Sequence, residues 1–186
     1  MMVKQLFIET EKKMKKALQA TQHELALIRT AKATTSLLDG IKVDYYGTSV
    51  PINQAAAISV PEPRMLVVQP WERGMIGEIE KVLLKSDLGL TPSNDGTVIR
   101  LPIPPLTQER RKELVRVVKR LAEEGRIAIR NIRRDANEEL RQAEKTGDLP
   151  QDDSKRAQEH IQELTDKHTE LVNKIVEEKE REIMEV

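Results

Sequence analysis

The segment from Thr107 to Lys145 reads TQERRKELVRVVKRLAEEGRIAIRNIRRDANEELRQAEK, and it decides the fold. Successive residues of a helix turn by about 100°, and at that step the apolar residues of the segment fall on one side. They are Leu114, Val118, Leu121, Ala128, Ile132, Ala136, Leu140 and Ala143. The pattern predicts one long amphipathic helix whose apolar face packs against other helices.

The opposite face of this predicted helix carries mostly positive charge. Its basic residues are Arg126, Arg130, Arg133 and Arg134, extended by Lys112, Arg116, Lys119 and Arg141 and interrupted by Glu123. Guanidinium groups pair bidentately with phosphate oxygens, so a row of arginines suits the regular phosphates of a nucleic acid. A charged face that is merely solvated is the alternative, and composition alone leaves both interpretations open.

Two further long helices are predicted, one at each end of the chain. The first runs from about Val3 to Arg29, with an apolar seam at Phe7, Met14, Leu18, Thr21, Leu25 and Ile28. The last runs from about Asp153 to Met184, with a seam at Ala157, Ile161, Leu164, His168, Leu171 and Ile175. Asp152 or Asp153 is expected to cap it. Three such helices predict a left-handed antiparallel bundle.

The segment 31–105 differs in composition from both flanks, because eight of the nine prolines lie between Pro51 and Pro105. Frequent prolines of this kind are typical of a segment of short strands and turns. The predicted strands are Lys42–Tyr46, Ala57–Val60, Met65–Gln69 and Thr97–Leu101. A short helix is predicted at Ile76–Lys85, closed by Gly89, and a tight turn at Asn94–Gly96. The segment is therefore expected to form a small α/β domain inserted between helices.

Charge is balanced overall, with 31 basic and 31 acidic residues, but it is unevenly distributed. Residues 106–145 hold 12 basic and 8 acidic residues, whereas residues 146–186 hold 6 basic and 12 acidic. The surface is therefore polarised along the chain. Cysteine is absent, which excludes disulfides and thiolate metal sites. We find no signal peptide and no apolar run long enough for a membrane span, so we expect a soluble cytoplasmic protein.

Catalytic motifs are missing from the sequence, which lacks both a phosphate-binding P-loop and a dinucleotide fingerprint. The three histidines have no metal-ligand spacing; His168 is expected in the core, and His23 and His160 on the surface. Trp71 and Phe7 are interpreted as packing anchors. We therefore expect no enzyme, metal or cofactor. With 2% aromatic residues, contact with RNA would be made through backbone and shape.

Several ordered stretches resemble the ribosome recycling factor family. They are LLDGIKVDYYG at Leu37–Gly47, KSDLGL at Lys85–Leu90, NDGTVIRL at Asn94–Leu101, PIPPLTQERRK at Pro102–Lys112, IAIRNIRRD at Ile127–Asp135, and the ending around Glu182–Val186. The family's fold is a long three-helix bundle with a small β/α/β domain inserted between its first and second helices. Its L-shaped outline looks like transfer RNA. The resemblance thus implies a two-domain α+β protein.

This resemblance also implies the domain boundaries and partners. Residues 1–30 and 106–186 would form the bundle, residues 31–105 the inserted domain, and hinges would lie near 30–36 and 102–107. The bundle would bind ribosomal RNA of the large subunit, and the insertion would meet elongation factor G, which uses GTP to drive subunit separation. No small-molecule substrate is implied, and a monomer is expected. The residues implied for RNA contact are Arg29, Lys32, Arg126, Arg130, Arg133 and Arg134.

One segment departs from the family pattern. The family commonly has Gly, then Arg or Lys, and then Ser/Thr-Pro at the first hinge, where this chain has Ala31, Lys32 and Thr34-Thr35. The second hinge contains Pro102, Pro104 and Pro105, which predict a stiff link. Two rival functions are a helical-bundle adaptor with no RNA role and an enzyme with an unfamiliar site in the insertion.

Overall fold

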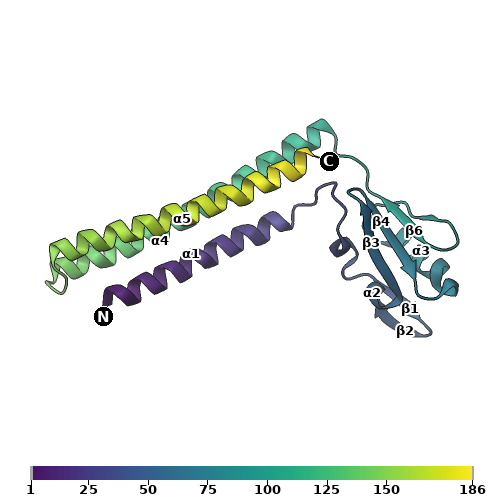
Figure 1. The fold of residues 1–186 in the computed structure, drawn as a ribbon, viewed down its shortest axis with the longest axis horizontal. Coiled ribbons are helices and arrows are strands. Elements are labelled where there is room, and N and C mark those ends of the chain that lie inside the picture. Colours follow the sequence, from purple (N-terminus) through teal and green to yellow (C-terminus); the bar gives the residue numbers. More distant parts are fainter. Residues whose placement is uncertain (1, 186) are drawn as a thin grey trace. The chain divides into compact units, whose positions relative to one another are not determined.

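The computed structural model describes residues 2–185 and divides them into two compact units. One unit comprises the chain up to Arg29 together with Gln108–Glu185, and the other comprises Thr30–Thr107 (Figure 1). The first is helical and the second contains the sheet, so the predicted two-domain α+β class is confirmed. Met1 and Val186, which end the predicted bundle ranges and the family-like C-terminal stretch, lie outside the described residues.

Three long helices build the first unit: α1 (Met2–Ala26), α4 (Gln108–Lys145) and α5 (Gln151–Met184). The predicted bounds of α4 differ from those observed by a single residue at its start. Helix α1 ends three residues earlier than predicted, so Arg29 follows the helix.

The prediction of an aspartate cap for α5 is wrong. Pro150 occupies the N-cap position, and its carbonyl oxygen accepts the backbone N–H of Ser154 at 2.9 Å. Proline suits this place because its fixed φ is compatible with a helix start and it has no N–H to satisfy. Asp152 and Asp153 lie in the first turn instead, where negative charge interacts favourably with the helix dipole.

Contacts between side chains give the direction of each helix. Arg126 of α4 contacts Asn173 of α5, and Arg133 contacts Gln162, so these two helices run antiparallel. Helix α1 is antiparallel to α4, since Thr21 lies beside Gly125 while Leu6 lies beside Ala143. It is parallel to α5, since Phe7 contacts His160 and Glu11 pairs with Lys167. The three helices therefore run down, up and down, as the predicted antiparallel bundle requires.

The buried face of each helix is shifted slightly from the predicted one. On α4, Ala122, Gly125 and Ile129 are buried, whereas the predicted Leu121, Ala128 and Ile132 are only half-buried. On α5, Val172 and Val176 replace Leu171 and Ile175. On α1, Leu6 and Thr10 are buried while Phe7 and Leu18 are half-buried. The reason is that each helix faces two neighbours, so the centre of burial lies between them and not on the most apolar stripe.

Gly125 permits a close approach of α1 to α4. A Cβ atom at this position would lie 2.3 Å from Oγ1 and 3.1 Å from Cγ2 of Thr21, well inside contact distance. Thr21 is itself buried, and its hydroxyl donates to the carbonyl oxygen of Ala17 at 3.1 Å. The absence of a side chain at position 125 therefore fixes the spacing of these two helices.

The second unit contains a hairpin and a four-stranded antiparallel sheet. Strands β1 (Lys42–Tyr45) and β2 (Thr48–Pro51) form the hairpin. The sheet has the order β3-β4-β6-β5, with β3 (Ala56–Glu62), β4 (Met65–Pro70), β6 (Ile99–Pro102) and β5 (Ser93–Asn94). Helix α3 (Ile76–Lys85) has the predicted bounds, and the short segments are η1 (Thr35–Leu38), α2 (Ile52–Ala55) and η2 (Arg73–Met75).

The short elements β2, α2 and β5 were missed by pattern reasoning, because a run of two to four residues contains too little periodicity. Gly89 does not close α3; the helix ends at Ser86, whose hydroxyl donates to the carbonyl oxygen of Leu83 at 2.6 Å. The predicted turn at Asn94–Gly96 is confirmed by a φ of +87° at Gly96, whose N–H donates to Asn94 Oδ1.

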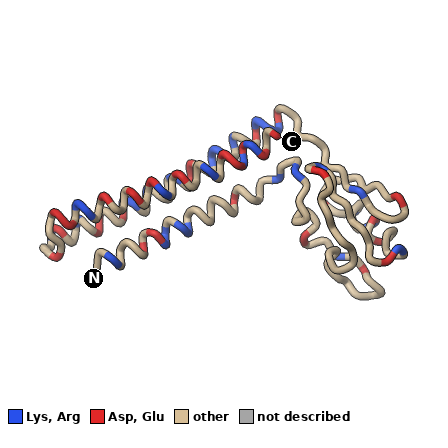
Figure 2. The backbone as a smooth tube through the Cα atoms, in the orientation of Figure 1, with Lys and Arg blue, Asp and Glu red and all other residues tan. Residues whose placement is uncertain are grey.

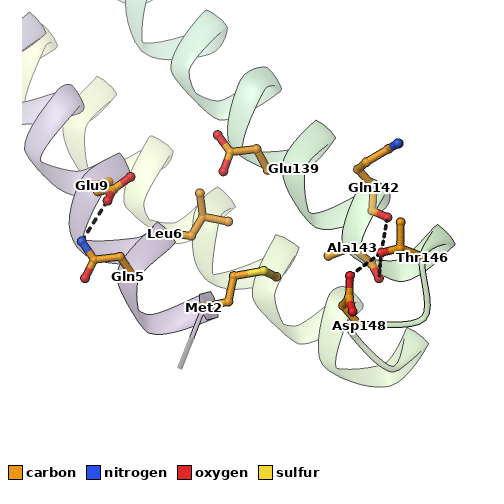
Figure 3. Close-up of a pocket in the computed structure, with 9 residues that line it drawn as sticks. All are labelled: Met2, Gln5, Leu6, Glu9, Glu139, Gln142, Ala143, Thr146 and Asp148. Atoms are coloured by element: carbon orange, nitrogen blue, oxygen red, sulfur yellow. Dashed lines mark hydrogen bonds between the residues drawn. The ribbon is translucent and has the colours of Figure 1, made fainter.

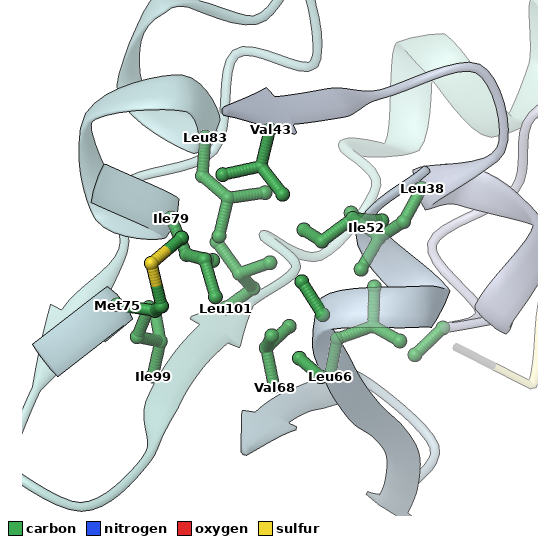
Figure 4. Close-up of a cluster of buried hydrophobic side chains, with 13 residues drawn as sticks. Leu38, Val43, Ile52, Leu66, Val68, Met75, Ile79, Leu83, Ile99 and Leu101 are labelled. Carbon is green, nitrogen blue, oxygen red and sulfur yellow. The ribbon is translucent and has the colours of Figure 1, made fainter. Parts of the chain in front are cut away.

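Alternating burial along the strands builds the core of this unit (Figure 4). Leu66 and Val68 of β4 and Ile99 and Leu101 of β6 are fully buried, with exposed or half-buried residues between them. Figure 4 shows side chains from α3, the hairpin and α2 in the same cluster; among them are Ile79, Leu83, Val43 and Ile52. The sheet therefore has one packed face, as period-two patterning requires.

Two interpretations of single aromatics need correction. Trp71 is not a packing anchor, because 65% of it is exposed. Phe7 is only half-buried, against the exposed ring of His160 at a centroid distance of 4.3 Å. His168 is buried as predicted, with Nδ1 2.7 Å from the carbonyl oxygen of Leu164.

Within residues 2–185, no helix has the length and apolarity needed to cross a bilayer. The same residues contain no cluster of three or more His, Cys, Asp or Glu side chains suited to hold a metal ion.

Candidate nucleic-acid interface

Arg126, Arg130, Arg133 and Arg134 lie on about two turns of α4, and we call them the arginine row. Basic residues concentrate in this part of the helix: residues 110–134 hold ten basic and three acidic residues, whereas residues 135–153 hold two basic and seven acidic. Figure 2 shows the basic positions interleaved with acidic ones along the α4–α5 pair. The row therefore forms the C-terminal end of a positive section, beyond which acidic residues predominate.

Two members of the row reach across to α5. The guanidinium of Arg126 donates from Nε and from a terminal nitrogen to Asn173 Oδ1, at 3.0 and 2.8 Å. Arg133 donates to Gln162 Oε1 at 3.0 Å, and Gln162 in turn donates to Asp166. Both arginines are half-buried. They are thus positioned along the seam between the two helices, which the sequence did not indicate.

The other two members point into solvent. Arg130 donates to Glu123 Oε1 at 2.6 Å, and its side chain is 49% exposed. Arg134 is 74% exposed and lies 3.6 Å from a carboxylate oxygen of Asp135. Hydrogen bonding by Arg130, assisted by Arg126, holds the pKa of the Glu123 carboxyl below its usual range. Glu123, the one interruption seen in the sequence, is therefore charged and bound to two members of the row.

Such exposed ion pairs add little stability, because water and salt screen them. A phosphate oxygen offers the same guanidinium a charged acceptor of equal or better geometry. Replacing Glu123 by a phosphate oxygen as the acceptor for Arg130 should therefore cost little free energy. Arg126 and Arg133 are only half-buried and are held in place by their amide partners, so the row is preorganised for a line of phosphates.

Arg29 and Lys32 are both exposed, but they belong to different units. Arg29 follows the end of α1 in the bundle unit, and Lys32 lies in the first linker, where its N–H donates to the hydroxyl of Thr30 at 3.4 Å. The residues that sequence reasoning grouped for RNA contact are thus divided: four lie together on α4, and two lie on separate linker positions.

The β3–β4 turn holds both linkers by backbone hydrogen bonds. Ala33 N–H donates to the carbonyl oxygen of Pro63 at 2.7 Å, and Ile103 N–H donates to that of Arg64 at 2.9 Å. Among the predicted hinge residues, Thr35 starts η1, Pro102 ends β6 opposite Met65, and the Thr34 hydroxyl is bonded to Ser36. Ala31 is buried and lies outside regular structure, as do the exposed Pro104 and Pro105. Freedom of the backbone is therefore restricted to the outer part of each linker.

A shallow cavity of about 500 Å³ lies at the other end of the bundle, between α1 and the end of α4 (Figure 3). Leu6, Ala143 and Met2 line its apolar part, and Glu9, Glu139 and Asp148 are its carboxylates. Its charge is opposite to that of the arginine row, so we exclude it from the nucleic-acid interface.

The partners of the arginine row were missed at the sequence level. Glu123 was visible as an interruption at spacings of three and seven residues from Arg126 and Arg130, but its hydrogen bonds were not. Nothing in the sequence signals Asn173 or Gln162, because 47 and 29 residues separate them from the arginines that they contact.

Comparison with known proteins identifies the family. A model of the ribosome recycling factor family matches residues 21–184. The chain is 54% identical over 185 residues to the ribosome-recycling factor of Desulforamulus reducens and 51% identical over 185 residues to that of Bacillus subtilis. Each of these alignments covers 100% of both chains.

Solved structures agree with this assignment. A solution structure of the ribosome recycling factor is similar with a TM-score of 0.73 and 45% identity, covering 100% of this chain and 99% of that one. The T. thermophilus ribosome recycling factor, described with E. coli elongation factor G on the E. coli post-termination complex, is similar with a TM-score of 0.63 and 48% identity; 97% of this chain and 98% of that one are covered. The chain therefore belongs to the ribosome recycling factor family, whose members are translation factors and not enzymes.

Proposed function

We propose that this chain binds the large subunit of post-termination ribosomes and, with elongation factor G and GTP, promotes dissociation of the ribosome from messenger RNA. It would act as a monomer on ribosomes of the cytoplasm. Family membership supports ribosome recycling itself. One solved relative is described together with elongation factor G on a post-termination complex, which supports the same two partners for this chain.

The arginine row is the observation that supports binding to ribosomal RNA. Four guanidinium groups within nine positions of α4 are each held by a hydrogen bond or ion pair, and none is fully buried. Rigid, solvent-accessible guanidinium groups suit the phosphates of folded ribosomal RNA, which proteins recognise largely through backbone and shape. Arg29 and Lys32 would add contacts from the linker positions.

Elongation factor G would contact the second unit and displace it. The β3–β4 turn ties both linkers to the sheet, so a displacement of this unit moves two chain connections together. The stiff Pro104-Pro105 link then transmits that displacement to α4. Residues 30–36 and 102–107 are thus proposed as the hinges. Thr34, Thr35 and Pro102 lie at the ends near the sheet, and Ala31, Pro104 and Pro105 lie in the outer parts.

Light scattering on purified post-termination ribosomes tests this proposal. The chain should split them into subunits when elongation factor G and GTP are present, and should do so poorly when either is left out. Binding to isolated large subunits should weaken steeply with salt, as phosphate contacts require. A chain that binds large subunits with no salt dependence and leaves ribosomes intact would instead favour the helical adaptor, whose arginines are only solvated.

A further inference from the structure

Three of the four aromatic residues in this chain gather at one place on the second unit. Tyr45 ends β1, Tyr46 follows it in the hairpin turn, and Trp71 follows β4. Tyr46 is 75% exposed and Trp71 is 65% exposed. Glu72, which follows Trp71 in the sequence, accepts hydrogen bonds from both tyrosine hydroxyls, that of Tyr45 at 2.5 Å. We call these four residues the aromatic cluster.

Tyr46 has a bulky side chain at a turn position whose backbone conformation favours asparagine or glycine. Tyr46 has φ +50° and is the only non-glycine residue with positive φ in the described part of the chain. Gly47 follows with φ +84°, so the two residues form the tight turn between β1 and β2. Asparagine or glycine suits the first position of such a turn, and a bulky side chain there is costly. Strain of this kind is typical of functional positions.

Hydrogen bonds fix the aromatic cluster before any partner arrives. Each oxygen of the Glu72 carboxylate receives one tyrosine hydroxyl, and the two tyrosine rings meet edge to face at 4.9 Å. The main chain at Trp71 is fixed by a backbone hydrogen bond, in which its amide N–H donates to the carbonyl oxygen of Ala55 at 3.1 Å. The two tyrosine rings are therefore already held in place. Rings held in this way lose little entropy on binding, which is the property of an interface hot spot.

Charge around the aromatic cluster favours a cationic occupant. Glu72 and Asp44 are negative, and Asp44 accepts the N–H of Gly47, while Arg73 is the neighbouring positive residue. The unit as a whole holds seven basic and eight acidic residues, so it lacks the excess of positive charge that RNA binding requires. A carboxylate keeps further lone pairs after accepting two hydroxyls, and aromatic faces attract guanidinium groups.

We infer that Tyr46 and Glu72, next in the chain to the exposed Trp71, form a docking site for an arginine side chain on a protein partner. The guanidinium lies against the exposed ring of Tyr46 and donates to the free lone pairs of Glu72. Because both tyrosine hydroxyls hold the pKa of Glu72 below its usual range, the carboxylate is charged when the partner binds. This site rests on the proposed function, since the partner is expected within the post-termination complex.

Four variants of the full chain test the docking site in the subunit-splitting assay. Tyr46→Asn relieves the backbone strain, so its melting temperature should not fall, yet its splitting rate should drop by about tenfold. Glu72→Lys should cause at least the same loss. The matched controls are Glu78→Lys and Leu84→Ala, on α3 of the same unit, where Glu78 and Leu84 are exposed outside the cluster; both should split ribosomes normally.

The sign of the Glu72→Lys effect decides the class of partner. A cationic protein segment is repelled by the new lysine, whereas a phosphate-bearing RNA is attracted by it. Unchanged or faster splitting by Glu72→Lys, or normal splitting by Tyr46→Asn, would overturn the inference. If the cluster had a purely structural role, a variant would lose splitting activity only when its melting temperature fell. Tyr46→Asn distinguishes the two roles, because it should lose activity at an unchanged melting temperature.

Photocrosslinking identifies the partner directly. With p-benzoyl-phenylalanine at position 46, complexes reconstituted from purified ribosomes, elongation factor G and GTP should give an adduct with an arginine-containing protein segment. An adduct with RNA alone, or none, contradicts the docking site. Binding of the same variant to large subunits is measured in parallel: if that binding fails in the unmodified chain as well, the proposed function is wrong and not only the docking site.

Discussion

Each arginine of the row has a different local environment. That environment sets how much the arginine contributes to helix packing and how much to the proposed RNA binding. Arg126 and Arg133 bond to amide oxygens of α5, so they help to hold the helix pair together while remaining only half-buried. Among the described residues, the recorded side-chain partner of Arg130 is Glu123, and Arg134 lies beside Asp135. Replacement of Arg130 should therefore affect binding without affecting packing.

Substitution of Arg130 by alanine should weaken binding to the large subunit while the bundle stays folded. One phosphate contact is lost, so the slope of log affinity against log salt should flatten by about one unit or less. Arg133→Ala should lower affinity too, with some loss of melting temperature, because Gln162 loses its donor. The matched control is Glu177→Lys on the exposed side of α5, which should change affinity much less. A folded Arg130→Ala variant with unaltered affinity and slope would remove this residue from the interface.

Gly125→Ala should destabilise the bundle by about 1–3 kcal/mol, the usual cost of overpacking. The added Cβ meets Oγ1 and Cγ2 of Thr21 at 2.3 and 3.1 Å, and rotation of a β-branched side chain cannot relieve both. Urea unfolding measures the loss. Gly77→Ala on α3 is the control, since nothing lies within 4 Å of its new Cβ, and it should be neutral or stabilising. In a Thr21→Ala background most of the cost should disappear; an equal cost there would mean that another contact is responsible.

Among the elements, the turn before β6 depends on one carboxylate. Asp95 accepts the N–H groups of Thr97 and Val98, each at 2.9 Å, and pairs with Arg100 at 2.6 Å. These hydrogen bonds, led by that of Val98, lower the pKa of Asp95 to about 2. This turn also positions β6, which lies between β4 and β5 in the sheet and is hydrogen-bonded to both.

This turn should therefore weaken in acid. The pKa of Asp95 is lower in the folded than in the unfolded chain, so its stabilising effect is complete above about pH 4 and is lost as the pH falls toward 2. The difference in melting temperature between wild type and Asp95→Asn should be largest near neutral pH and shrink through that window. A difference that stays constant between pH 6 and pH 2 would show that the charge of Asp95 does not stabilise the turn.

At the scale of the whole molecule, the second linker connects the two units through consecutive prolines. Changing Pro104 and Pro105 to glycine should leave binding to the large subunit intact, because the arginine row is untouched. Splitting with elongation factor G should slow several-fold, since a flexible link transmits displacement poorly. Stopped-flow light scattering gives the rate. Splitting at the full rate would make this link a simple spacer.

Removal of the second unit should separate binding from recycling. Thr21 lies beside Gly125, so α1 ends near position 120, and α4 extends twelve residues, or about 18 Å, beyond it to Gln108. A Gly/Ser linker of about eight residues from Arg29 to Gln108 spans that distance. The resulting bundle should be helical by circular dichroism and bind large subunits, but should fail to split ribosomes. A folded deletion variant that still recycles would show that the second unit is dispensable.

Much of the bundle could be predicted because α4 is long and strongly periodic. Ten turns of helix repeat the apolar pattern often enough to determine its bounds, and the same repetition places Arg126, Arg130, Arg133 and Arg134 on one side. The bounds of α3 were predicted equally well, since a strongly amphipathic segment lies between glycine-containing turns. In contrast, β2 and β5 could not be predicted, because strands of four and two residues depend on the partner strand for their hydrogen bonds.

The sequence by itself determined the class of the fold, the three long helices, the arginine row and, through its ordered motifs, the family. Those features depend on periodicity and residue type, which are local properties of the chain. Only the tertiary structure decided what each candidate site residue contacts: Asn173 and Gln162 for two of the arginines, Glu72 for Tyr46, and solvent for Trp71. Such contacts join residues far apart in the chain, and a side chain's environment is set by whichever element packs beside it.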